Sequence, residues 1–125
     1  MGAQDFYEVA SKKDYPTAVS AFEALVKSAQ YDHGHAGYTG TIAEKGGFTK
    51  PVVIPDEFAG DWNDIISSFD WPEDTDTVTP LAQFCIDKYG RTKYDDMIGT
   101  WNDKWGAALC LETSTKWIFT GLASS

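Results

Sequence analysis

Apolar side chains return every three or four residues in three stretches of the chain, which is the spacing of one face of an α-helix. The first stretch covers residues 15–32 and carries a stripe of Val19, Phe22, Val26 and Ala29. Polar residues occupy most of the positions between them. The pattern therefore predicts a helix over 15–32 with one face turned toward a core.

The second and third helical stretches cover residues 57–69 and 80–89. In the second, apolar and acidic side chains fall on opposite faces. The third is bounded by strong local signals, because Thr79 can cap its start, Pro80 suits its first turn, and Gly90 can end it. Both stretches are predicted to be helices.

Two other stretches are typical of β-hairpins. The first covers 38–54 and has the turn signal Gly46-Gly47 at its middle. Pro51 cannot donate a ladder hydrogen bond, so the second strand of this hairpin is expected at a sheet edge. The second hairpin covers 107–122, and apolar groups on both faces of its strands predict central strands covered on both sides.

Two remaining segments are less regular. Residues 4–10 are compatible with a short strand, while 91–106 fit either a short helix over 93–98 or an irregular aromatic loop. The overall prediction is an α+β fold with a single domain over 1–125. It has a small antiparallel sheet, made of the two hairpins, packed with about three helices.

Composition supports one compact domain. The chain has 125 residues, of which 42% are hydrophobic and 14% aromatic, enough for a core without metal or disulfide staples. Cys85 and Cys110 lie inside apolar runs, which favours buried free thiols in a reducing cytoplasm. The first residues form no signal peptide, and no apolar run approaches the ~20 residues of a membrane span. We expect a cytoplasmic protein without a cofactor.

The charge pattern is more unusual. The net charge of −9 disfavours direct binding to nucleic acid, whose phosphates it would repel. No Lys or Arg occurs from Pro51 through Asp87. On the predicted helix 57–69 the acidic residues form one face, which would attract a basic, nucleic-acid-binding protein. The competing interpretation is an acidic surface that only keeps the protein soluble. The candidate partner-binding residues are Asp56, Glu57, Asp61, Asp64, Asp70, Glu73, Asp74 and Asp76.

A second hypothesis is a small-ligand site for a nucleotide-like molecule on the glycine-rich segment 33–45. Gly34, Gly37 and Gly40 would let backbone N–H groups approach a phosphate. Known phosphate loops lead into a helix, whereas this one follows a helix, so helix capping is the simpler explanation of the glycines. The candidate ligand-binding residues are His33, His35, Tyr38, Thr39, Thr41, Lys45, Lys104 and Trp105.

A third hypothesis is a metal-dependent enzyme built on His33 and His35. Two histidines two residues apart share one face of an extended segment and could bind one metal ion, with Asp32 as a third ligand. The chain has no other histidine, so any further ligands would be distant carboxylates. Histidines in a turn at a helix end are the alternative, and no catalytic residue is assigned.

Three stretches resemble a group of small proteins encoded by bacteriophages and prophages. They are HGHAGYTGTIAEK (33–45), DKWGAALCLE (103–112) and WIFTGLAS (117–124). The shared motifs are H-G-H-x-G-Y-T-G-T-I and K-W-G-x-A, and the middle of the chain, 51–90, lies outside the resemblance. The resemblance carries over no catalytic residue. It implies an accessory protein in the host cytoplasm that blocks a host enzyme or defence system. Combined with the acidic face, this predicts an inhibitor of a host defence or nucleic-acid-binding factor. The sequence is also compatible with a homo-oligomer.

Overall fold

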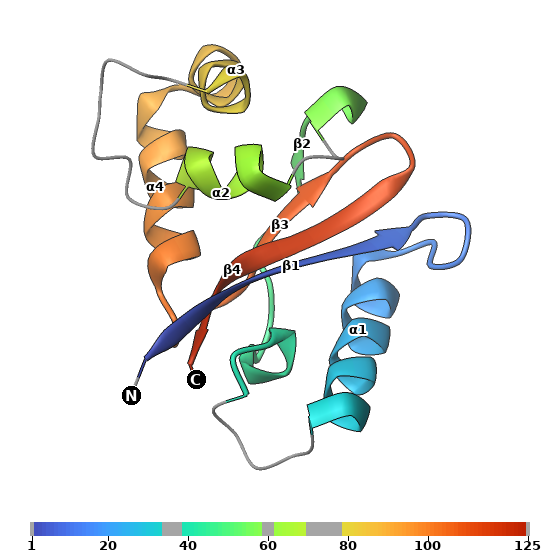
Figure 1. The fold of residues 1–125 in the computed structure, drawn as a ribbon. Coiled ribbons are helices and arrows are strands. Elements are labelled where there is room, and N and C mark those ends of the chain that lie inside the picture. Colours follow the sequence, from blue (N-terminus) through green and yellow to red (C-terminus); the bar gives the residue numbers. More distant parts are fainter. Residues whose placement is uncertain (1, 34–38, 59–61, 70–78, 125) are drawn as a thin grey trace.

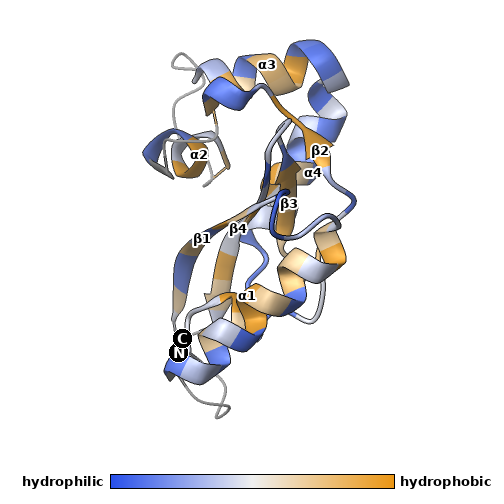
Figure 2. Cartoon of the chain, turned by 90° about the vertical axis from the view of Figure 1, so that its right-hand side faces the viewer, coloured by the Kyte–Doolittle hydropathy of each residue, from blue (hydrophilic) through white to orange (hydrophobic). Residues whose placement is uncertain are grey.

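The computed structural model describes residues 2–33, 39–58, 62–69 and 79–124. The chain forms one small α+β domain, a four-stranded mixed sheet with helices on both faces (Figure 1). The first and last strands are neighbours, so the two ends of the chain lie side by side (Figure 2).

The sheet has the strand order β1-β4-β3-β2. Its central strand β4 pairs antiparallel with β1 on one side and with β3 on the other. The outer strand β2 runs parallel to β3, which makes the sheet mixed. The strands are β1 (Ala3–Ser11), β2 (Val52–Val53), β3 (Leu109–Glu112) and β4 (Lys116–Ser124).

Helix α1 lies on one face of the sheet, and α2, α3 and α4 lie on the other. Two short 3-10 helices, η1 and η2, lie in the connections around β2. The α-helices are α1 (Ala18–His33), α2 (Trp62–Phe69), α3 (Pro80–Tyr89) and α4 (Arg91–Asn102), and the 3-10 helices are η1 (Ile42–Glu44) and η2 (Asp56–Phe58).

Each face of the sheet has its own hydrophobic core, because alternate side chains of β3 and β4 point to opposite faces. Cys110 and Phe119 belong to the core under α1, while Leu111 and Ile118 belong to the core under α2, α3 and α4. Trp101 is fully buried in the second core and donates its Nε1 hydrogen to Thr120 Oγ1 at 3.0 Å. The predicted central strands covered on both sides are confirmed.

The predicted hairpin over 107–122 is confirmed, but the predicted hairpin over 38–54 is wrong. Residues 42–44 form η1 instead of a strand, and the side chain of Thr41 caps that turn by accepting from Ala43 N. The second half of the predicted hairpin becomes β2, which pairs with β3 rather than with its own neighbour in sequence. This strand lies at a sheet edge, as Pro51 indicated.

The predicted helices are largely present. The stretch 80–89 is α3 with the expected Thr79 cap, and Gly90 follows it with a left-handed φ of 92°. The stretch 15–32 is α1 with slightly later bounds. The stretch 57–69 contains η2 and α2 as separate elements, and the ambiguous 91–106 contains a fourth helix, α4.

The segment 4–10 is part of β1, a full strand of nine residues. The antiparallel sheet of two hairpins is therefore replaced by a mixed sheet to which β1 contributes an edge. Within the described ranges, no helix is both long enough and apolar enough to cross a membrane.

Candidate functional site

The predicted acidic surface is described in part. Asp56 and Glu57 lie on η2, and Asp64 lies in the first turn of α2; all three are exposed. The exposed position of Asp64 agrees with the amphipathic pattern, since Ile65 beside it is fully buried. The other candidates lie outside the described residues: Asp61, Asp70, Glu73, Asp74 and Asp76.

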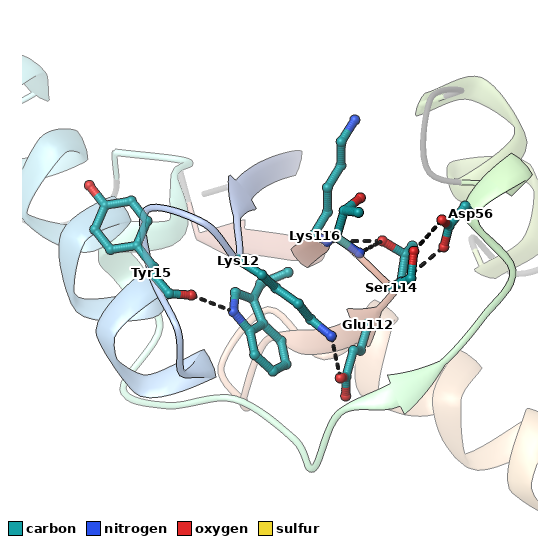
Figure 3. A network of polar contacts seen from close by, with 9 residues as sticks. Lys12, Tyr15, Asp56, Glu112, Ser114 and Lys116 are labelled. Carbon is teal, nitrogen blue, oxygen red and sulfur yellow. Dashed lines mark hydrogen bonds and ion pairs between the residues drawn. The ribbon is translucent and has the colours of Figure 1, made fainter.

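Asp56 also has a structural contact that the sequence did not reveal. Its carboxylate accepts hydrogen bonds from the backbone N–H of Ser114, at 2.9 Å, and from the Ser114 hydroxyl. These bonds, helped by the charges of Lys12 and Lys116, lower the pKa of Asp56. Asp56 therefore ties η2 to the turn between β3 and β4 (Figure 3).

Basic side chains lie close to this contact. The Nζ of Lys12 is 2.5 Å from a carboxylate oxygen of Glu112 and 4.6 Å from the centroid of the Trp117 ring. The Nε1 of Trp117 donates to the Tyr15 carbonyl at 2.8 Å, which fixes the ring (Figure 3). The local charge around Asp56 is thus mixed, and the purely acidic part of the candidate surface begins further along the chain, at Glu57.

The predicted ligand site is also described in part. The hydroxyls of Thr39 and Thr41 form hydrogen bonds within their own segment. Their Oγ1 atoms lie 2.8 Å apart, and Thr39 Oγ1 donates to Glu44 Oε2 at 2.7 Å. His35 and Tyr38, two further candidates, lie outside the described residues, as does the side chain of His33. The two threonines therefore stabilise the turn around η1.

Lys45 is the candidate cation whose environment differs most from the prediction. Only 4% of its surface is exposed, and its Nζ donates to the Asp103 carbonyl at 2.9 Å. Burial lowers the pKa of Lys45, and the nearby Asp103 charge opposes that effect. The ammonium of Lys45 is directed into the protein and holds the Asp103 turn, and a contact between Lys45 and a ligand stays a prediction.

Asp103 organises the turn that follows α4. Its Oδ1 accepts from Trp105 N at 3.0 Å, and its carbonyl accepts from Gly106 N at 3.2 Å. A side chain at Gly106 would place its Cβ 2.7 Å from Asp103 Oδ2, so glycine is the residue that fits this turn without a shift. The sequence pattern did not single out Asp103, although Asp followed by Gly three positions later is a common turn signal.

The Asp103 turn presents Lys104 and Trp105 on the surface. Trp105 is 63% exposed, and Lys104 Nζ lies 5.2 Å from the centroid of its ring. The structure thus brings two of the predicted ligand-site segments together, with Lys45 behind the turn and Trp105 on its outer side. An exposed indole next to an ammonium can stack on a planar group or anchor a partner.

The sequence stretches 33–45, 103–112 and 117–124 meet at this corner of the fold in their described parts. Gly40, in a left-handed conformation with φ 70°, donates its N–H to the Ser124 carbonyl at 2.8 Å. Lys45 contacts Asp103, and β4 itself contains the third stretch. The described parts of these three stretches therefore form one continuous structural unit, made of η1, the Asp103 turn and the end of β4.

The two thiols are buried and free. Burial raises the pKa of Cys85 to about 11 and, together with the Glu112 charge, that of Cys110 to about 12. Both thiols are therefore protonated near neutral pH and are poor nucleophiles.

Metal-ligating residues do not gather in the described part of the chain. No group of three or more His, Cys, Asp or Glu side chains lies together there. The side chain of His33 and all of His35 fall outside it, so the metal hypothesis stays a prediction.

No family model, curated protein or solved structure matches the chain.

Proposed function

We propose that the protein is a bacteriophage or prophage accessory protein that binds a basic host protein. The target class is a defence or nucleic-acid-binding factor in the host cytoplasm, and binding inhibits it. The surface is the acidic one predicted from the sequence, which begins at Glu57 on η2 and continues along α2 and the segment 70–76. This is a binding function, with no reaction assigned to the protein.

The observation that carries the proposal is the charge distribution between Pro51 and Asp87. This span has nine acidic residues and no basic one, within a chain of net charge −9. The described acids of the span on η2 and α2 are exposed, while the apolar side of α2 is buried in the core that it shares with α3 and α4. Glu57 on η2 and Asp64 on α2 both present exposed carboxylates, and acidic groups of this kind can meet a surface that normally receives phosphates.

The test is a charge reversal on α2 and just before it, Asp61→Lys with Asp64→Lys. Immobilised wild-type protein should capture a basic protein from a lysate of the host, and the purified captured protein should bind more weakly as salt increases. The double variant should weaken that binding by about tenfold or more, since like charges then face each other. Calorimetry with the purified partner measures the change.

The matched control reverses two exposed acids of α1, Glu23→Lys with Asp32→Lys. This variant has the same net charge as the test variant, but its changes lie on the opposite side of the sheet. Equal binding by the two variants would show that only net charge matters. Binding unchanged by the Asp61 and Asp64 reversals would refute the proposed surface.

A small-ligand function is the second candidate, and the exposed Trp105 with the partly buried Lys104 beside it favours this function. Under this second function the Asp103 turn would hold the Trp105 indole in place for stacking against a base, and the Lys104 ammonium would face a phosphate. A nucleotide that raises the melting temperature of the wild type but not of Trp105→Ala would support it. Equal melting temperatures with and without nucleotides would remove it.

A further inference from the structure

Strand β1 forms one edge of the sheet and is unusually long for that position. It pairs with β4 along its whole length, from Ala3 opposite Ser124 to Ser11 opposite Lys116. No described strand pairs with its outer side. In Figure 2 it lies at the margin of the sheet. An open edge of this length is a template for adding another strand.

The hydrogen-bond pattern shows which backbone groups face outward. Lys12 N donates to Thr115 O at 2.8 Å, which continues the register of the β1–β4 ladder by one residue. Antiparallel ladders alternate, so even-numbered residues of β1 point their backbone groups toward β4. The Phe6 carbonyl agrees, because it accepts from Thr120 Oγ1 on β4 at 2.8 Å. The backbone groups of Asp5 and Val9 therefore point away from the sheet.

Packing holds this edge in place from both faces. Phe6 and Ala10 belong to the core under α1, and Tyr7 and Val9 pack against the core under α2, α3 and α4. The edge is therefore pre-organised, and a strand added to it would require little ordering of β1 itself.

The two ends of this segment carry charges of opposite sign. Asp5 lies near the start of β1, and the exposed Lys13 follows its end. When two copies of such a strand pair antiparallel, the acidic start of each meets the basic end of the other. With Val9 of one copy opposite Val9 of the other, Asp5 lies beside the end of the second copy's β1, and Lys13 stands in the turn that follows Ser11.

We propose that two copies of the protein associate through β1, edge to edge and antiparallel, with twofold symmetry. The two four-stranded sheets then join into one continuous sheet. Backbone hydrogen bonds supply the attraction, and the Asp5–Lys13 pairs set the register. This surface is separate from the acidic one on α2, so either proposal can fail without the other.

The test is sedimentation velocity on the full chain, over a concentration series that reaches the high micromolar range, because edge pairing buries little area. The wild type should shift from monomer to dimer along the series. Asp5→Lys and Lys13→Glu should each raise the dissociation constant about tenfold, since twofold symmetry repeats every new repulsion. The double variant, Asp5→Lys with Lys13→Glu, should restore dimerisation.

Lys93→Glu is the matched control, because Lys93 is exposed on α4. It makes the same charge change as Lys13→Glu and should dimerise like the wild type. Circular dichroism of every variant confirms that the fold is kept. A wild type that stays monomeric throughout the series would overturn the proposal, and so would a dimer that neither single variant weakens.

Discussion

Lys45 shows how one buried side chain can join two segments far apart in the chain. Its ammonium reaches across to the Asp103 carbonyl, so η1 and the turn after α4 hold each other in place. A buried charged group is costly unless it is hydrogen-bonded, and this contact supplies one such bond. From the sequence alone Lys45 was a candidate ligand contact, because a lysine after a glycine-rich segment gives no sign of its own burial.

Lys45→Ala is expected to lower the free energy of unfolding by about 2 kcal/mol, through the lost charge-assisted hydrogen bond and the lost packing of the side chain stem. Lys50→Ala, at an exposed position nearby, should leave it nearly unchanged. Urea unfolding followed by tryptophan fluorescence measures both. If Lys45→Ala kept full stability but abolished stabilisation by a nucleotide, Lys45 would be a ligand contact after all.

At the scale of elements, the contact between η2 and the β3–β4 turn depends on one carboxylate. Asp56 accepts two hydrogen bonds from Ser114, one of them from its backbone. Since β3 and β4 are neighbouring strands within the sheet, this contact attaches η2 to the turn that joins them. The orientation of η2 should therefore depend on Asp56.

Asp56→Ala is expected to lower the melting temperature at neutral pH, whereas Glu57→Ala, its exposed neighbour, should not. The pKa of Asp56 is lowered in the folded state, so its stabilisation is complete above the ordinary aspartate value. It is lost as pH falls through the lowered value. The difference between wild type and Asp56→Ala should thus shrink below about pH 4. Thermal unfolding across pH tests this, and a difference independent of pH would contradict it.

The elements predicted correctly are those with local signals. Helix α3 has its cap, proline and terminal glycine within the segment itself, and the β3–β4 hairpin joins strands adjacent in sequence. The hairpin over 38–54 failed because hydrogen bonds among Thr39, Thr41 and Glu44 favour a compact turn, which the β-rich composition does not reveal.

The contacts that sequence reasoning missed are long-range. The parallel pairing of β2 with β3 and the pairing of β1 with β4 join segments that have no sequence signal for each other. In the candidate sites, exposure of Asp64 followed from the helical period, but the burial of Lys45 depends on the Asp103 turn, more than fifty residues away.

For the whole molecule, the dominant quantity is its net charge of −9. Like charges repel more strongly in the compact state than in the extended chain, so they oppose folding, and salt screens them. The melting temperature should therefore rise by a few degrees between low salt and ~0.15 M sodium chloride, where the screening length is about 8 Å.

The variant with Glu23→Lys and Asp32→Lys has a net charge of −5, because each replacement adds two positive charges to −9. Its melting temperature should rise less with salt, and differential scanning calorimetry can measure both curves. An equal rise in the melting temperature of the two proteins would show that salt does not act by screening the net charge.

The position of β4 also bears on how the protein is made. It is the last strand in sequence, yet it lies in the middle of the sheet and hydrogen-bonds to both neighbours. During synthesis β1 leaves the ribosome before β4, and more than a hundred further residues must follow before this pairing can form. Pairings so distant in the chain make folding slow. In the incomplete chain the aromatic side chains of β1 therefore stay without their β4 neighbours. The yield of folded protein in the cell should depend on chaperones and on the rate of translation.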